Sequence, residues 1–388
     1  MLNWQRASRW TLPALAALLS LTVSTDRSVA FGATIVVAAS DASEKSKATA
    51  DYVCDGSGDQ EEINAAIEAL PEVGGLVLLT EGRFDIRRID GELGGVLIKR
   101  SHVVLAGSGS ATRLTQAAAQ ETNVIRIIGP GIGFITIRDL VVDANRDENP
   151  IGEGDRNVSH ARFEFCGIKG FCQVPGKTAM PLHDITIRNT HVLNARRLGI
   201  MLEGRNMRVI ENVLGNAMSD SVEILTGPGE IRGNTFEITG RTHVAAGTDR
   251  ANSIIMAENI VHVRKGGDLD IGFRSWSQSQ RHVIANNIVT VDPGGTCRFA
   301  MDIRGFGAAV TGNVIHASDP DKPLTLRISA GNTLVANNVF ENVVIEVDDK
   351  TERNKPIMIH GNLLENSRID WKKGNLNGKR THSTGPSF

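Results

Sequence analysis

HVIANNIVTV at residues 282–291, AAVTGNVIHA at residues 308–317 and TLVANNVFE at residues 333–341 share one pattern: an alternating apolar run, an Asn and a second β-branched run. An Asn begins such a run eight times, at Asn189, Asn212, Asn234, Asn259, Asn287, Asn313, Asn338 and Asn362. The intervals are 23, 22, 25, 28, 26, 25 and 24 residues. A period in this range is typical of a solenoid, in which each unit buries its apolar face by stacking on its neighbours.

The residues around each Asn favour strands. Runs such as ITIRN, VIANN and LVANN alternate and are rich in Val and Ile. A leucine-rich repeat, the other solenoid of this period, needs runs of the LxxLxLxxN type, and no window between residues 185 and 345 has the composition of a recurring helix. We therefore predict an all-β parallel β-helix with three short strands per turn, about 4.8 Å between turns, and the Asn side chains stacked inside.

The first thirty residues predict a signal peptide. Arg6 and Arg9 precede an apolar stretch over residues 12–23, and Ser28-Val29-Ala30 offers small residues for cleavage. We therefore expect a secreted or periplasmic protein, and cleavage after Ala30 would change the formal net charge from −2 to −4. The mature chain has no basic run to bind nucleic acid and no other long apolar segment to cross a membrane.

The mature chain is expected to be a monomer with one domain over residues 31–371 and a polar, disordered tail over residues 372–388. Export permits disulfides, and Cys166 and Cys172 enclose the short loop GIKGF, which favours a bridge between them. Buried free thiols are the alternative for these two and for Cys54 and Cys297.

The segment from about residue 34 to residue 90 predicts an N-terminal cap. A strand at ATIVVAAS precedes turn residues and an acidic helix start, for which Asp59 is the expected N-cap. The apolar side chains expected on one face of this helix are Ile63, Ala66, Ile67 and Leu70. Strands follow at once, so the helix would close the open end of the coil, where unpaired strand edges promote aggregation.

Two segments carry a resemblance to a known family. DGSGDQEEINAAIEALPEVGGLVLLTEGRFDI at residues 55–86 resembles the entry segment of the pectate lyase superfamily, and IRDLVVDANRD at residues 137–147 resembles one of its turns. The resemblance covers residues 34 to 370 and implies a right-handed, single-stranded parallel β-helix. Lyases, epimerases, glycosidases, fructotransferases and non-enzymatic phage or surface proteins share these features, so the chemistry must come from individual residues. The Tyr-Gly-Phe-Asp-Pro-His type motif of the family's epimerases is absent, and the only Tyr is Tyr52.

The Asn period supplies a register for outward-facing side chains. Counting back eleven residues from each Asn gives one column that starts at Met201, Glu223 and Thr248, and aligning LDIGFRS with the same strand adds the next turn. The charged residues expected on this outer face are Glu203, Glu223, Arg250, Asp270, Arg274, Asp302, Arg304 and Arg327. In this register Asp270 would lie opposite Asp302, and Arg304 opposite Arg327.

Such a column can bind an extended glycan along the solenoid axis. The residues predicted to be catalytic are Asp270, Arg274, Asp302, Arg304 and Arg327, with Ca²⁺ held by Asp270 and Asp302. Glu203, Glu223 and Arg250 are expected to bind substrate, and Trp276 to stack on a sugar ring. The alternative is a solvated face whose opposite charges pair across turns.

The insertion between Asp139 and Asn189 is a second candidate, because long excursions from a solenoid commonly wall a cleft. Its polar residues are Asp143, Asn145, Arg146, His160, Arg162, Glu164 and His183. His160, Arg162 and Glu164 alternate in SHARFEFCG, so they would share one face of a strand and contribute to substrate binding.

The hypotheses for function fall into three classes. A lyase or epimerase of an acidic polysaccharide would neutralise a uronate carboxylate with Arg or Ca²⁺ and remove the proton at C5, which is the function that we expect. A glycoside hydrolase would use paired carboxylates, for which Asp270 and Asp302 are candidates. A non-catalytic β-helix would bind glycan or coat a surface.

Overall fold

The computed structural model describes residues 32–150, 165–172, 180–348, 356–372 and 382–383. The predicted signal peptide, the candidate residues His160, Arg162 and Glu164, and nearly all of the predicted tail lie outside these ranges. No helix within them is long and apolar enough to span a membrane.

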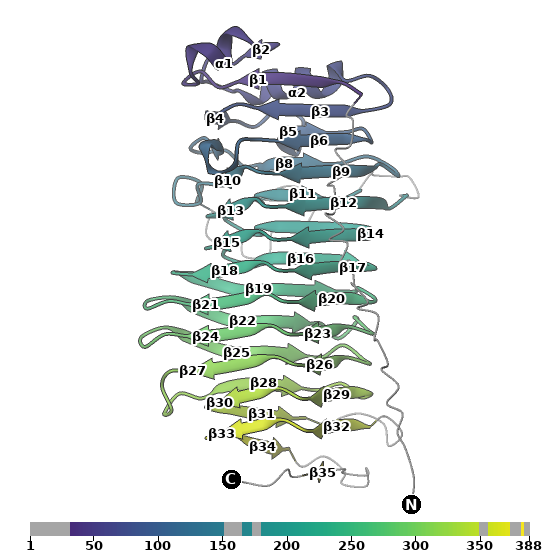
Figure 1. Cartoon of the computed structure of the whole chain (residues 1–388), viewed down its shortest axis with the longest axis vertical. Helices are drawn as coiled ribbons and strands as arrows, with labels where there is room; N and C mark the ends of the chain where they lie inside the picture. Colours follow the sequence, from purple (N-terminus) through teal and green to yellow (C-terminus); the bar gives the residue numbers. More distant parts are fainter. Residues whose placement is uncertain (1–31, 151–164, 173–179, 349–355, 373–381, 384–388) are drawn as a thin grey trace, which may run out of the picture. The chain divides into compact units, whose positions relative to one another are not determined.

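The described chain is a right-handed parallel β-helix with three strands per turn, as the Asn period predicts (Figure 1). The first face stacks β5 (Gly94–Ile98), β8 (Asn123–Ile127), β11 (Ile168–Gly170), β14 (Ile200–Ile210), β16 (Asp220–Thr226), β19 (Arg241–Asp249), β22 (Asp268–Ser275), β25 (Thr296–Ile303), β28 (Leu324–Ile328), β31 (Val343–Val347) and β34 (Arg368–Trp371). The second face stacks β1 (Thr34–Ala38), β3 (Gly75–Leu79), β6 (Val103–Ala106), β9 (Gly133–Arg138), β12 (Leu182–Arg188), the end of β14, β17 (Gly229–Arg232), β20 (Ile254–Ala257), β23 (Val283–Ala285), β26 (Ala309–Thr311), β29 (Thr333–Ala336), β32 (Ile357–His360) and β35 (His382–Ser383).

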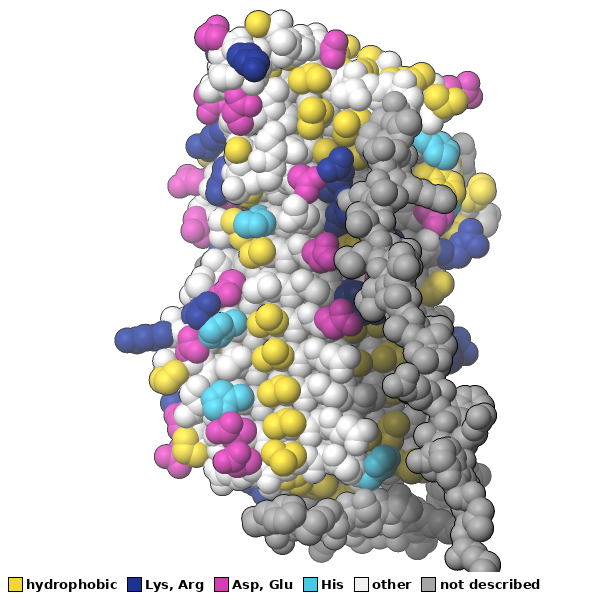
Figure 2. All heavy atoms as spheres, in the orientation of Figure 1, with side chains coloured by type: hydrophobic (Ala, Val, Ile, Leu, Met, Phe, Trp, Pro, Cys, Tyr) yellow, Lys and Arg dark blue, Asp and Glu magenta, His cyan; other side chains and the backbone are white. Residues whose placement is uncertain are grey.

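The third face is a separate sheet. It stacks β4 (Gly82–Ile86), β7 (Thr112–Gln116), β10 (Val141–Asp143), β13 (His191–Leu193), β15 (Val213–Gly215), β18 (Thr235–Ile238), β21 (Ile260–Val263), β24 (Ile288–Val291), β27 (Val314–Ala317), β30 (Val339–Glu341) and β33 (Leu363–Glu365). From β21 onward its strands begin with exposed aliphatic residues, and Figure 2 shows a column of hydrophobic side chains along the lower half of the coil. This column comprises Ile260, Ile288, Val314, Val339 and Leu363.

Aliphatic and aromatic side chains stack inside the coil. Phe273, Met301, Leu326 and Ile345 occupy one register on four successive turns, and each is fully buried. Burial of such side chains stabilises the fold by roughly 1.5–3 kcal/mol each.

The Asn ladder forms as predicted from Asn212 to Asn362. The Nδ2 atom of Asn287 donates to Oδ1 of Asn313 at 2.9 Å and to the carbonyl of Met256, while its own Oδ1 accepts from the backbone and side chain of Asn259. The prediction is wrong for Asn189, whose side chain instead donates to Asp139. The buried Thr190 takes the ladder position and donates its backbone N–H to Asn212.

The predicted helix is α2 (Gln60–Ala69), which packs on β1 and β5 at the N-terminal end of the coil (Figure 1). Its buried face carries Ile63, Ala66 and Ile67, and Leu70 follows it, also buried. Asp59 does not cap this helix through its side chain, because its carboxylate accepts from the backbone N–H groups of Gly56 and Asp85. The remaining short elements are α1 (Glu44–Ala48), β2 (Tyr52–Val53) and the 3₁₀ turn η1 (Gly109–Ala111).

The predicted bridge between Cys166 and Cys172 is not formed, and all four cysteines are free thiols. Cys172 packs in the main interior of the coil, whereas Cys166 packs in a separate cluster with Leu198, Met201 and Leu225. The two side chains therefore lie in different apolar environments, which keeps their sulfur atoms apart.

Candidate active site

A column of outward-facing residues follows the first face. In register on successive turns lie Met201, Glu223, Gly247, Arg274, Asp302, Arg327 and Glu346. Glu223, Arg274, Asp302 and Arg327 were predicted to lie on this outer face, and the structure places all four in the column.

Two positions in the predicted register are wrong. Gly247 occupies the column in place of Thr248, which is fully buried, and Arg274 lies opposite Asp302 where Asp270 was expected. Counting from the Asn assumes that every turn has the same corners. Corners of different length break this assumption, since residues 227–228 separate β16 from β17, residues 250–253 separate β19 from β20, and residues 276–282 separate β22 from β23.

Arg274 ties two carboxylates together. Its Nη2 donates to Asp220 at 2.6 Å and to Glu223 at 2.8 Å, and the side chains of Arg274, Asp220 and Glu223 are 9%, 2% and 15% exposed. The guanidinium reaches Glu223 across the intervening turn because Gly247 has no side chain. A Cβ at that position would lie 3.1 Å from Asp220 Oδ2 and 3.2 Å from Arg274 Nη2.

Burial changes the protonation of the acids in this region. Burial, together with the Asp220 carboxylate, raises the pKa of Glu223 to about 7, although Arg274 opposes both effects. Burial also raises the pKa of Glu203, whose Oε2 atom has no hydrogen-bond partner among the described residues, while Arg250 and Lys169 lower it. Glu223 is therefore poised to hold a proton near neutral pH, whereas its neighbour Asp220 bears the ion pair with Arg274.

Asp302 is held by two arginines. It is fully buried, accepts from Nε of Arg327 at 2.9 Å and forms an ion pair with Nη2 of Arg304 at 2.9 Å. Arg304 and Arg327 thus converge on one carboxylate rather than lying directly opposite each other. Asp270 instead binds Arg241 at 2.5 Å. The proposed Ca²⁺ pair of Asp270 and Asp302 depends on the incorrect register, and each carboxylate already has a cationic partner.

Two aromatic rings of the region, Trp276 and Phe299, lie against arginine guanidinium groups. Trp276 lies 5.2 Å from the Arg274 guanidinium and 4.3 Å from that of Arg304, measured from the ring centre. Phe299 lies 4.9 Å from Arg298 and 4.1 Å from Arg327. The rings therefore position the arginines, a role that the sequence did not indicate for Trp276.

These groups surround a cavity of about 140 Å³, here called the small cavity. It is lined by His243, Asp270, Ile271, Trp276, Arg298, Phe299, Arg304 and Arg327. The His243 ring lies 3.7 Å from Asp220 and 3.9 Å from Asp270, and its side chain is 44% exposed. An imidazole between two carboxylates thus faces three guanidinium groups.

Sequence reasoning missed Asp220, His243 and Arg298. His243 lies one residue before Val244, which pairs with Ile271, and Asp270 lies one residue before Ile271. With the correct register of β22, counting one repeat back from Asp270 would have identified His243 as its neighbour on the preceding turn.

The second predicted site has structural contacts in its described part. Arg146 donates to the carbonyl of Asn216 at 2.7 Å, Asn145 donates to that of Gln116 at 3.0 Å, and Asp143 pairs with Arg113 at 2.7 Å. His183 lies 2.8 Å from Asp184. These residues brace neighbouring turns and do not line the small cavity.

A group of three potential metal ligands, Cys54, Asp59 and Glu62, lies at the N-terminal end of the described coil. Both oxygens of Asp59 already accept backbone N–H groups, and burial raises the pKa of the Cys54 thiol. A neutral thiol and an occupied carboxylate are poor metal ligands, so we assign this group to the fold.

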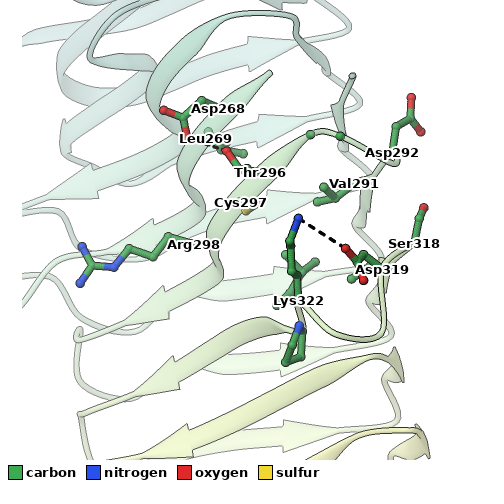
Figure 3. A pocket seen from close by; sticks show the side chains of 15 residues that line it. Asp268, Leu269, Val291, Asp292, Thr296, Cys297, Arg298, Ser318, Asp319 and Lys322 are labelled. Atoms are coloured by element: carbon green, nitrogen blue, oxygen red, sulfur yellow. Dashed lines mark hydrogen bonds and ion pairs between the residues drawn. The ribbon is translucent and has the colours of Figure 1, made fainter. Parts of the chain in front are cut away.

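A larger cavity of about 230 Å³ adjoins the small one and shares Arg298 with it. Figure 3 shows its walls, with Asp268, Thr296 and Cys297 on one side and Ser318, Asp319 and Lys322 on the other.

Comparison with known proteins gives similarity in structure alone, since no protein-family model and no curated protein matches the chain. The A-module of the mannuronan C-5 epimerase AlgE6 from Azotobacter vinelandii is 16% identical with a TM-score of 0.51, over 86% of this chain and 97% of that one. DFA-IIIase from Arthrobacter chlorophenolicus A6 is 14% identical with a TM-score of 0.54, over 89% and 87%. The N-terminal fragment of bacteriophage phi29 gene product 12 is 15% identical with a TM-score of 0.58, over 81% and 64%. The chain thus shares the parallel β-helix fold with these three proteins.

Proposed function

We propose that the protein is a carbohydrate-active enzyme that removes the C5 proton of a uronate in an acidic polysaccharide, as a lyase or an epimerase. The observation that carries the proposal is the small cavity, in which Arg298, Arg304 and Arg327 face the imidazole of His243. A uronate residue needs both a cation for its carboxylate and a base for its C5 proton. The likeness to a mannuronan C-5 epimerase module is consistent with this chemistry.

The arginines would bind the uronate carboxylate and stabilise the charge that develops on it as the C5 proton leaves. Among them Arg298 has no ion-pair partner within the described residues, so its guanidinium is available to a ligand. Arg304 and Arg327 share Asp302, and both residues line the cavity.

His243 would be the base. It accepts the C5 proton on one ring nitrogen while Asp220 and Asp270 stabilise the imidazolium that forms. In elimination, the electron pair from the broken C5–H bond forms the C4–C5 double bond and the glycosidic oxygen leaves C4. In epimerisation, C5 receives a proton on the opposite face instead.

Glycoside hydrolysis is the second candidate, because of the Asp220 and Glu223 pair. Both carboxylates accept from one nitrogen of Arg274, at 2.6 and 2.8 Å, so their bonded oxygens lie within the roughly 5.5 Å typical of retaining glycosidases. Burial raises the pKa of Glu223 to about 7, which gives the protonated acid that this reaction requires. Against it, both groups lie behind Arg274 and neither lines the small cavity.

Incubation with a panel of polyuronates and neutral glycans separates the candidates. New ultraviolet absorbance from the C4–C5 double bond indicates elimination, reducing ends without absorbance indicate hydrolysis, and retention without turnover indicates a glycan-binding protein. His243→Ala and Arg298→Ala should each abolish most of the turnover of a polyuronate. His316→Ala is the matched control, since His316 pairs with Glu341 on the third face, away from the cavity. Unchanged turnover in His243→Ala would exclude the proposed base.

A further inference from the structure

The two cavities follow one strand. The larger cavity is lined by Thr296, Cys297 and Arg298 of β25, and the small cavity by Arg298 and Phe299 of the same strand and by Arg304 just beyond it. Strands run across the solenoid axis in this fold (Figure 1). The two cavities meet at Arg298 and are together called the depression, which extends along β25 and so across the axis, whereas the sequence suggested a track along the axis.

Cationic groups are spaced along this depression. Arg304 and Arg327 lie at one end, Arg298 lies between the cavities, and Lys322 lies on the far wall. Figure 3 shows the Arg298 side chain extending away from Lys322, so the two charges serve different parts of the depression. Lys322 is 73% exposed and only 3.5 Å from Asp319, a loose surface pair that a ligand carboxylate can replace.

The acids of the larger cavity already have partners. Asp268 accepts from Arg241 at 2.7 Å and from Thr296 at 2.7 Å, and Asp292 lies 2.8 Å from His262. Burial, helped by Asp270, raises the pKa of the Cys297 thiol to about 12, so this side chain is neutral. Leu269, Val291 and Leu324 border the larger cavity but are nearly fully buried and pack in the interior of the coil, so polar groups dominate the surface open to a ligand.

We infer that the larger cavity is a second subsite for acidic glycan, and that the sugar chain crosses the solenoid along β25, with the carboxylate of the reacting uronate at Arg298, Arg304 and Arg327 and that of a later residue at Lys322. This inference rests on the proposed function and adds the direction and extent of the bound chain.

The test measures kcat and KM with uronate oligomers of defined length, a trimer and a hexamer, for the wild type, Lys322→Ala and Ser318→Trp. Lys322→Ala should raise KM for the hexamer about two- to five-fold, the range of one exposed ion pair, and leave the trimer unchanged. Ser318→Trp fills the larger cavity without altering charge, and should raise the hexamer KM to that of the trimer. The control is Lys265→Ala, an exposed lysine on the corresponding loop two turns earlier that does not line the cavity.

Equal effects on both oligomers, or no effect of either variant on the hexamer, would overturn the inference while the proposed function stands. A wild type that neither binds nor converts any uronate oligomer would overturn both. Thermal unfolding of each variant shows whether it is folded. If Ser318→Trp does not fold, Lys322→Ala still tests the inference, because it changes an exposed side chain.

Discussion

Nη2 of Arg274 donates to Oε1 of Glu223 at 2.8 Å, although a whole turn of the coil separates their strands. Gly247 lies between them in the column, and its missing side chain leaves the passage that the guanidinium occupies. The same nitrogen holds Asp220 at 2.6 Å, and Asp220 in turn lies 3.7 Å from the imidazole of His243. A buried ion triad thus supports one wall of the small cavity.

Arg274→Met should destabilise the protein strongly, because it leaves Asp220 and Glu223 buried without a cation. Breaking a buried pair costs about 3–5 kcal/mol, to be measured as the free energy of unfolding in denaturant. Arg208→Met is the control, since the exposed pair of Arg208 and Glu230 should contribute less than about 1 kcal/mol. Adding Asp220→Asn and Glu223→Gln to Arg274→Met should restore much of the loss. A loss in Arg274→Met no larger than the control would contradict the role of the triad.

Gly247→Val should displace Arg274 and lower both activity and stability. Overpacking of this kind typically costs about 1–3 kcal/mol, and we expect Gly247→Ala to cost less because only small shifts relieve contacts of 3.1 to 3.3 Å. The matched control is Gly32→Val, where an added Cβ would meet only Val73 at 3.9 Å. Full polyuronate turnover in Gly247→Val would show that Arg274 has another route to its partners.

Glu223 should make stability depend on pH. Its pKa rises on folding from the ordinary value of 4.5 to about 7, so between these pH values the native state binds more protons than the unfolded state. The free energy of unfolding should therefore fall as pH rises from 4.5 to 7, by on the order of 3 kcal/mol from this group. Glu223→Gln should lack this component when unfolding is measured across the same range, and parallel profiles for the two proteins would refute the assignment.

His282 contributes in the opposite direction. Burial lowers its pKa to about 4 from 6.5, and its Nδ1 accepts the backbone N–H of Ile254 at 3.1 Å. The unfolded state therefore binds more protons between pH 4 and 6.5, and stability from this group is lost as pH falls through that window. His282→Gln should reduce the loss of stability on acidification, measured by denaturant unfolding at pH 4.5 and 7. An unchanged acid loss would mean that other groups dominate.

The coil could be predicted because the Asn side chains form their hydrogen bonds with equivalent Asn residues on neighbouring turns. Each ladder Asn, such as Asn287, bonds the equivalent Asn of the next turn and a backbone carbonyl, so the residue must recur once per turn. Asn189 has the spacing of a ladder residue, but the neighbouring Thr190 occupies the buried ladder position in its place. Spacing alone does not distinguish these two neighbours.

The active-site register could not be predicted to the residue. The first face lies far along the chain from the ladder corner, and every irregular corner between them shifts the count. A shift of one residue put Thr248 in the column in place of Gly247, and a shift of four put Asp270 in place of Arg274. Counting eleven residues back from the Asn did place Glu223, Asp302 and Arg327 correctly in the column.

Asn287→Ala should cost more stability than Asn362→Ala. Asn287 is fully buried with ladder partners on both sides, so its loss leaves polar groups on two turns unsatisfied, at about 1–3 kcal/mol for each buried group. Asn362 is part-exposed and, within the described residues, has a ladder partner on one side, Asn338, besides the Val335 carbonyl to which its Nδ2 donates, so water can replace it at lower cost. Denaturant unfolding of both variants decides the matter, and equal costs would mean that the ladder adds no stability beyond local bonds.

The most direct test of the central claim is an NMR spectrum of polyuronate after incubation with the wild type and with His243→Ala. We predict that the wild type produces either C4–C5 unsaturated ends or inverted C5 centres, that His243→Ala produces neither, and that neutral glycans are unchanged. A polyuronate left intact by the wild type, or converted equally by His243→Ala, would contradict the account.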